Sequence, residues 1–321
     1  MQLLSPEVIE KKILENFFEY HNLFVEFESN FLSEMYNRYQ GVENGNLVLY
    51  FAKSTHQEIL RQKDYNLNFD LSFEKFWENH SLINLEKKSI IKIASDTSLP
   101  KETTRRKISL LIKQKVLNKK NKNIEWSPNE QYKKNYNLFI QKEIRDISKL
   151  INFICKKINI NISNKEITEE LKKKFSFYWF HYLDAQLKYL KLWSQQLNDL
   201  EILLIGMQFI CLFSSEAKKK NLFHQNIYKD TSLIKNYISA SVSATSIAEV
   251  TGISRATCIR KLVALVEMKV VSQDKISKRY YLAQDILSNN LASKKINEEA
   301  IKLFSEFYFI CLRAINTKNS N

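Results

Sequence analysis

Glycine and proline are scarce in this sequence, and that scarcity restricts the fold more than any other feature. The chain of 321 residues contains four glycines and three prolines. Sheet-rich folds need both residues at their many turns, because glycine supplies positive φ and proline presets the bend. A chain with so few of either is predicted to be mainly α-helical. Phosphate-binding motifs are disfavoured as well, since neither GxGxxG nor GxxxxGK[ST] occurs in the chain.

Length and residue types predict an ordered protein with two domains of ordinary size. Hydrophobic residues make up 44% of the chain and aromatic residues 12%, which is not a disordered composition. The longest apolar stretch, residues 202–213, is shorter than the roughly twenty residues of a membrane helix, so we expect a buried core helix there. The four cysteines form no CxxC pair and are expected to be buried, reduced thiols. No secretion signal is recognisable, so a cytoplasmic location is expected.

Positive charge is concentrated in two short segments. The net charge is +14, and residues 101–122 hold nine basic residues against one acidic residue. Residues 255–279 hold seven basic residues against two acidic ones, whereas residues 1–80 carry more acidic than basic residues. Two focused basic patches on an otherwise balanced chain are typical of phosphate-binding surfaces. The charge pattern therefore favours a nucleic acid as the partner.

The two basic segments belong to an internal repeat. A shift of 154 residues aligns IASDTSLPKETTRRKISLLIKQKVL (93–117) with IAEVTGISRATCIRKLVALVEMKVV (247–271). Weaker matches flank this core: Phe-Ile-Cys recurs after each copy, and an aromatic cluster around His21 resembles one around His181. The repeat predicts a duplication with its boundary near residue 160. We therefore expect a pseudo-dimer in one chain, with units at residues 1–160 and 161–321.

Each copy has the pattern of a winged helix-turn-helix. In the second copy a short helix, with Ile247, Ala248 and Val250 on its inward face, precedes Gly252, which can adopt the positive φ of a turn. Ser254 can then cap the next helix. In the first copy Ser98 replaces the turn glycine at some cost in strain, and Pro100 replaces the capping serine.

Short strands around a polar turn are predicted to form the wing after each pair of helices. The expected fold class is mainly α, with two tandem helical units that each contain a winged helix-turn-helix with a small β-wing. The winged helix-turn-helix segments are expected at about residues 85–127 and 232–283. A closing helix is expected after each wing, at about residues 138–158 and 296–315.

The second copy resembles the helix-turn-helix of the Crp/Fnr and MarR families of bacterial regulators. The resemblance rests on Ile-Ala-Glu-x-Thr-Gly-Ile-Ser-Arg-x-Thr-x-x-Arg at residues 247–260, and residues 99–106 keep the Crp/Fnr spacing of base, Glu and Arg. It covers only the repeated segments. It implies DNA binding by a recognition helix whose first, second and sixth residues read bases. The cyclic-nucleotide domain of Crp-like proteins is not expected, because the upstream regions are predicted to be helical, and no cofactor is implied.

The residues expected to contact DNA lie on the recognition helices and the wings. Arginine suits bidentate contact with guanine, and glutamate can accept from cytosine N4. The expected base-contacting residues are Lys101, Glu102, Arg105, Arg106, Arg255, Ala256, Ile259 and Arg260. The expected phosphate-contacting residues are Thr103, Lys107, Lys119, Lys120, Lys122, Thr257, Lys261, Lys275, Lys278 and Arg279. Because alanine replaces glutamate at 256, base readout is expected to differ between the copies.

Other chemistry is not indicated. The sequence shows no paired carboxylates, metal-spaced cluster or nucleophile motif, so neither an enzyme nor a metal site is expected. His21 and His181 are expected to be partly buried structural residues, with a ligand or pH-sensing role as the alternative. The aromatic run at residues 175–193 is expected to be helix core, with an effector pocket as the alternative.

The sequence therefore predicts a cytoplasmic, nucleoid-associated bacterial transcriptional regulator that binds double-stranded DNA. Two recognition helices predict two half-sites about one helical turn apart. A plasmid-type replication initiator is one alternative, and a winged-helix protein-interaction scaffold of a chromosome-organising complex is another. No membrane partner is expected. A homodimer and a small-molecule effector are left open, as are the target sequence and the direction of regulation.

Overall fold

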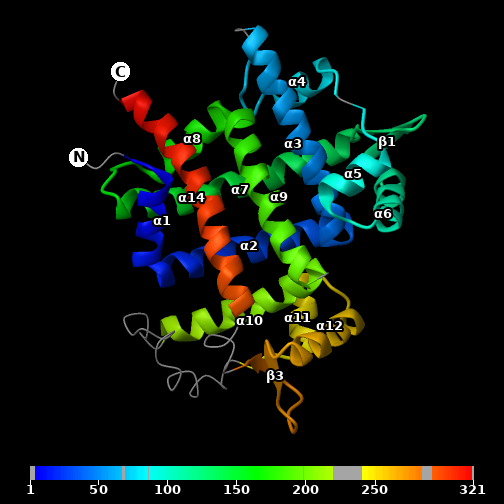
Figure 1. The fold of residues 1–321 in the computed structure, drawn as a ribbon, viewed down its shortest axis with the longest axis vertical. Helices are drawn as coiled ribbons and strands as arrows, with labels where there is room; N and C mark the ends of the chain where they lie inside the picture. Colours follow the sequence, from blue (N-terminus) through cyan, green and yellow to red (C-terminus); the bar gives the residue numbers. More distant parts are fainter. Residues whose placement is uncertain are drawn as a thin grey trace. The chain divides into compact units, whose positions relative to one another are not determined.

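A computed structural model describes residues 4–66, 69–85, 87–197, 199–219, 241–283 and 291–319. Within these residues the protein is mainly helical and contains two small antiparallel sheets of two strands each (Figure 1). The mainly α fold class, expected from the scarcity of glycine and proline, is thereby confirmed.

The helices and strands follow a similar order in the two halves of the sequence, although α4 has no counterpart among the described residues of the second half. The first half contains α1 (Pro6–Glu15), α2 (Phe17–Tyr39), α3 (Val42–Tyr65), α4 (Phe76–Leu82), α5 (Ile90–Thr97), α6 (Lys101–Lys113), β1 (Leu117–Lys120), β2 (Asn123–Trp126) and α7 (Glu130–Lys157). The second half contains α8 (Asn164–Lys173), α9 (Phe175–Leu197), α10 (Leu200–Lys219), α11 (Ala244–Thr251), α12 (Arg255–Glu267), β3 (Val271–Gln273), β4 (Tyr280–Leu282) and α14 (Leu291–Asn319).

Four pairs of these helices have equal lengths. Helices α1 and α8 have 10 residues each, and α2 and α9 have 23 each. Helices α5 and α11 have 8 residues each, and α6 and α12 have 13 each. The similarity between the halves therefore extends beyond the segment in which their residues match.

The chain folds into two compact units, and each unit combines segments of both halves. Unit 1 comprises residues 1–14, 43–191 and 300–321, and unit 2 comprises residues 15–42 and 192–299. Helix α2 of the first half thus belongs to unit 2, whereas most of α9 belongs to unit 1. The compact units therefore do not follow the expected division at residue 160, because these helices bury their apolar faces against elements far away in sequence.

An aromatic cluster forms the centre of unit 1. The ring of His56, from α3, stacks on Phe76 at 4.7 Å and meets Phe175 edge-on at 5.1 Å between ring centroids. Trp126, at the end of β2, packs against Tyr136 of α7 at 5.5 Å. All five side chains are buried. The cluster thus joins the end of the first hairpin to helices α3, α4, α7 and α9.

Helix α10 is the central element of unit 2, where it packs against α2, α11, α12 and β4. Gln208 donates to the Ser29 hydroxyl at 2.7 Å, and Ser214 donates to the Asn22 side chain at 2.6 Å, which fixes α10 on α2. Among the described residues α10 is the one helix long and apolar enough to cross a membrane. In unit 2 much of its surface is covered by protein, as the sequence predicted for residues 202–213.

Candidate nucleic-acid interface

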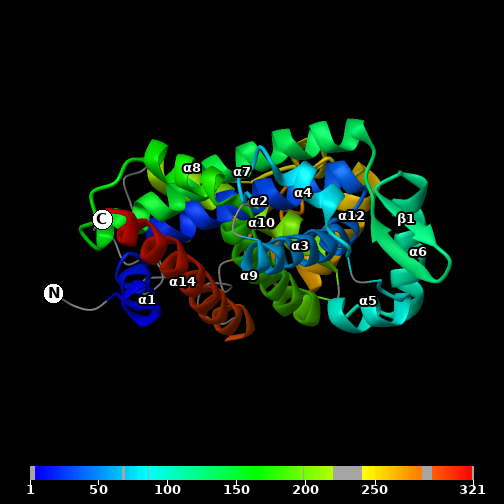
Figure 2. The same ribbon diagram turned by 90° about the horizontal axis from the view of Figure 1, so that it is seen from above.

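In unit 1 two short helices and a hairpin form a compact local motif. Helix α5 begins after Ser89, whose hydroxyl accepts from the Lys92 amide at 3.3 Å, and ends at Ser98 in the left-handed conformation with φ 56°. Helix α6 begins after Pro100 and leads into strands β1 and β2 (Figure 2). A bridge between Lys88 and Ile124 adds a third short extended segment to the hairpin.

Unit 2 contains the same arrangement. Helix α11 ends at Gly252 with φ 76°, and α12 begins after Ser254, whose hydroxyl accepts from the Thr257 amide at 3.3 Å. Strands β3 and β4 follow, and a bridge joins Val242 to Tyr280. The positive φ at residues 98 and 252, and the cap at Ser254, confirm the turn chemistry predicted from the sequence.

The turn that follows the second helix of the motif, α6 in unit 1 and α12 in unit 2, is also repeated. Lys115 and Lys269, one hundred and fifty-four residues apart in the sequence, both adopt positive φ, at 58° and 57°. The next amide donates back into the helix in each case: Val116 to the Leu111 carbonyl at 3.0 Å, and Val270 to that of Leu265 at 2.9 Å. The two hairpins therefore leave their helices by the same turn.

Two details of the sequence prediction need correction, and a third lies outside the described residues. Val250 is 64% exposed and does not face inward, whereas Ile247 and Thr251 of the same helix are buried. His21 is the fifth residue of α2 and His181 the seventh of α9, so they do not occupy equivalent positions. Residues 232–240, the expected start of the second winged motif, lie outside the described residues.

The expected base-contacting residues are mostly solvent-exposed. Ile259 is half-buried. The other members of this group are exposed: Lys101, Glu102, Arg105, Arg106, Arg255, Ala256 and Arg260. Within the described residues, Arg106 and Arg260 form no hydrogen bond or ion pair with another side chain. They occupy the sixth position of their respective helices, and their guanidinium groups are available to a ligand.

Three of the other charged residues make local contacts on the surface. Arg105 pairs with Glu102 one turn earlier, and both side chains stay more than 60% exposed. Arg255 donates from Nε to the Thr245 hydroxyl at 3.1 Å. Such exposed contacts are worth about 1 kcal/mol or less, so a ligand with stronger hydrogen-bonding groups can replace them.

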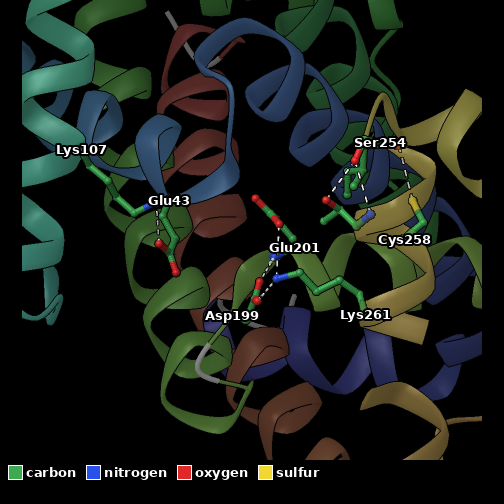
Figure 3. A network of polar contacts seen from close by, with 9 residues as sticks. Glu43, Lys107, Asp199, Glu201, Ser254, Cys258 and Lys261 are labelled. Atoms are coloured by element: carbon green, nitrogen blue, oxygen red, sulfur yellow. Dashed lines mark hydrogen bonds and ion pairs between the residues drawn. The ribbon is translucent and has the colours of Figure 1, made fainter. Parts of the chain in front are cut away.

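Lys107 and Lys261 are held in ion pairs within the protein, so the structure gives no support to the phosphate contacts predicted for them. Lys107 Nζ lies 2.8 Å from the Glu43 carboxylate, and Lys261 pairs with Asp199 and lies 3.4 Å from Glu201 (Figure 3). Their side chains are only 17% and 12% exposed. The expected flanking threonines, Thr103 and Thr257, are half-buried.

The acidic partners of these lysines were not predicted. Glu43 lies in the first turn of α3 and Glu201 in the first turn of α10. The two positions differ by 158 residues, whereas the matching basic segments differ by 154. An alignment of the long helices by their start positions would have revealed the repeated pair.

The other basic residues that were predicted to contact phosphates lie on the two hairpins. The exposed basic side chains on them are Lys119, Lys120 and Lys122 in unit 1 and Lys275, Lys278 and Arg279 in unit 2. Lys120 lies 3.4 Å from Glu125 on the neighbouring strand. Arg279 donates to the hydroxyl and the carbonyl of Ser241 at 3.1 and 2.7 Å, which holds its guanidinium beside the turn end of the second hairpin.

No alternative chemical site is apparent in the described residues. They contain no group of three or more His, Cys, Asp and Glu side chains that could hold a metal. The cysteines are free, and burial raises the pKa of Cys155 and Cys211 to about 11. Burial also lowers the pKa of His21 to about 4 and that of His181 below its ordinary value. These groups are therefore neutral at pH 7.

The aromatic run of α9 is packed into protein rather than lining a pocket, with Tyr178, Trp179, Tyr182 and Tyr189 buried. A cavity of about 170 Å³ lies elsewhere in unit 1, between α3 and β2. It is smaller than the roughly 300–1,000 Å³ of typical ligand pockets, so it gives no support to an effector site.

Comparison with known protein families, curated proteins and solved structures found no match for this chain.

Proposed function

We propose that this chain is a sequence-specific double-stranded DNA-binding protein that acts as a transcriptional regulator. One observation carries the proposal: Arg106 and Arg260 stand unpaired, among the described residues, at the same position of two exposed helices, each followed by a basic hairpin. Neutral scaffolding surfaces have no need of such repeated, solvent-facing positive charge.

The local geometry of both motifs supports their assignment as winged helix-turn-helix elements. Two helices joined by a tight turn precede an antiparallel hairpin, and a bridge adds a third extended segment in each. In such a motif the second helix enters the major groove, and the hairpin lies along the backbone or the minor groove. Helices α6 and α12 are then the recognition helices, and the two hairpins are the wings.

The equal helix lengths support a duplication, and hence a pseudo-dimer within one chain. Two recognition helices require a DNA site of two parts. Because Glu102 corresponds to Ala256 and Arg105 to Ile259, the two parts differ in sequence. The target is therefore an imperfect palindrome or an imperfect direct repeat.

Each exposed group has a chemical partner on the duplex. Arg106 and Arg260 can make bidentate hydrogen bonds to guanine O6 and N7, and Glu102 can accept from cytosine N4 after its pair with Arg105 opens. The exposed lysines of the wings supply phosphate contacts that position the helices without reading sequence.

Selection from a random duplex pool at two salt concentrations tests the proposal. We expect wild type to enrich a two-part motif and the double variant Arg106→Ala/Arg260→Ala to lose it. Arg145→Ala/Arg313→Ala is the matched control, because it removes two exposed positive charges from α7 and α14 and leaves both recognition helices intact.

Two results would contradict the proposal. Salt-sensitive binding without enrichment would show an architectural DNA-binding protein, because phosphate contacts alone carry no sequence information. Absence of binding would favour the protein-interaction scaffold instead.

A further inference from the structure

The outward faces of the two recognition helices differ in polarity. On α6 the exposed positions include Glu102, Arg105 and Ser109, all polar. The corresponding positions on α12 are Ala256, Ile259 and Val263, all apolar. Ala256 is exposed, Ile259 is half-buried, and Val263 is 49% exposed.

The three apolar residues form one stripe on α12. They are spaced at i, i+3 and i+7, which places them on the same face of a helix, and Arg260 at i+4 lies beside them. From Ala256 to Val263 the helix rises about 10 Å, which matches roughly three base-pair steps of 3.4 Å. The stripe is therefore long enough to follow several bases along a groove.

Charge next to the stripe identifies its partner. Arg255 and Arg260 border it and are exposed, so an apolar protein surface that covered the stripe would also have to desolvate two guanidinium groups. A DNA major groove satisfies both features, because it offers anionic phosphates and guanine acceptors beside the C5-methyl group of thymine. That methyl group is the apolar feature by which the major groove distinguishes thymine.

We infer that α12 recognises thymine methyl groups through Ala256, Ile259 and Val263, whereas α6 reads its half-site through polar contacts. This inference rests on the proposed DNA-binding function and specifies the half-site that each helix recognises. The half-site of α12 is rich in A·T pairs with thymines under the stripe. The half-site of α6 depends on hydrogen-bonding base edges instead.

Replacement of thymine by deoxyuridine in the selected site tests the inference with the full chain. Deoxyuridine keeps the pairing and the O4 acceptor and removes only the methyl group. The single variants Arg106→Ala and Arg260→Ala first assign each half-site to its helix. We then expect affinity to fall about fourfold for each contacted methyl group in the α12 half-site, and to stay unchanged in the α6 half-site.

A matched pair of variants links the effect to the stripe. Val263→Ser, which introduces the α6 residue at an exposed position, is expected to weaken binding to the thymine duplex and to lose the part of the deoxyuridine sensitivity that comes from the methyl group in contact with Val263. Ser109→Ala, at the corresponding position of α6, is expected to retain that sensitivity.

Equal binding of thymine and deoxyuridine duplexes in both half-sites would overturn the inference and leave the proposed function intact. The same holds if Val263→Ser retains full deoxyuridine sensitivity. A selection that enriches no motif would refute the proposed function itself, so the two failures are distinguishable.

Discussion

Lys107 and Glu43 form an ion pair at 2.8 Å that connects α6 to the first turn of α3. Lys261 makes the equivalent connection from α12 to Glu201 at 3.4 Å, with Asp199 as a further partner. Each exposed basic helix is thus fastened to a long helix of its own unit by a lysine on its inner side. These lysines position the two helices, whereas other side chains, such as Arg106 and Arg260, present positive charge to solvent.

Lys107→Gln is therefore expected to lower stability rather than phosphate contact. Loss of a partly buried pair leaves Glu43 unpaired, at a cost of about 1–2 kcal/mol in the free energy of unfolding. The salt dependence of DNA binding should stay unchanged, whereas Lys122→Gln, at an exposed wing position, should reduce the log–log slope by about 0.9 without affecting stability. Urea unfolding and salt titrations measure both quantities. A reduced slope for Lys107→Gln would return this residue to the phosphate-contacting set.

The turn residues Gly252 and Ser98 should respond in opposite directions to substitution. Gly252 has φ 76°, and a Cβ there would lie 1.9 Å from Asn37 Oδ1, so Gly252→Ala should destabilise the protein by about 1–3 kcal/mol. Ser98 has φ 56°, and Ser98→Gly should stabilise by up to about 1 kcal/mol. Thermal or urea unfolding checks both.

The double variant Gly252→Ala/Asn37→Ala separates the two causes of the first effect. The double variant removes the clash with the Asn37 side chain but keeps alanine at positive φ. It should therefore recover only part of the lost free energy of unfolding. An unchanged unfolding midpoint for Gly252→Ala would mean that this turn is not held at positive φ.

His56 should make the protein less stable as the pH falls. Burial lowers its pKa from 6.5 to about 3, with a smaller effect of His80. Above pH 6.5 the ring is neutral in both the folded and the unfolded state, and its full contribution to stability is present. Below pH 6.5 the unfolded chain binds a proton that the folded protein excludes, which costs about 1.4 kcal/mol per pH unit.

His56→Phe is expected to remove that part of the pH dependence. Neither ring nitrogen of His56 has a hydrogen-bond partner among the described residues, so the variant should be at least as stable at pH 7. Urea unfolding of both proteins at pH 7, 6, 5 and 4.5 gives the difference between their free energies of unfolding. The carboxylates are common to both proteins, so their titration does not contribute to this difference. Parallel curves over this range would refute the assignment.

The two halves of the sequence should not fold separately. Unit 2 requires α2 from the first half, and unit 1 requires most of α9 from the second. Fragments 1–160 and 161–321 are therefore expected to lack cooperative unfolding when expressed alone and to recover it when mixed. Circular dichroism and thermal unfolding of each fragment and of the mixture test this. Two independently stable fragments would contradict the observed partition of contacts.

Local features were the most predictable part of this protein. Gly252 and Ser254 specify a turn and a cap through their own backbone and side-chain chemistry, and the structure has both. The strands at residues 117–126 and 271–282 likewise follow from short strand-forming segments on either side of a polar turn. Such features depend on a few neighbouring residues, which the sequence presents directly.

Packing partners could not be derived in the same way. An apolar stripe on α2 predicts that this face is buried, yet nothing in its residues specifies α10 as the partner. The pairing of Lys107 with Glu43 was missed for the same reason, and both lysines were expected to face a phosphate. His21 and His181 were matched by similar aromatic surroundings, whereas the starts of α2 and α9 place them two positions apart.

The exchange of α2 into unit 2 also affects how the chain can fold on the ribosome. Helix α2 ends at residue 39, and α10, on which it packs, begins at residue 200. At about 5–20 residues per second, translation of the intervening segment takes on the order of ten to thirty seconds. During that interval the apolar side chains Phe24, Phe27, Phe31 and Leu32 have been made and their final partner has not. The nascent chain therefore carries an apolar helix without its packing partner while about half of its length is being synthesised.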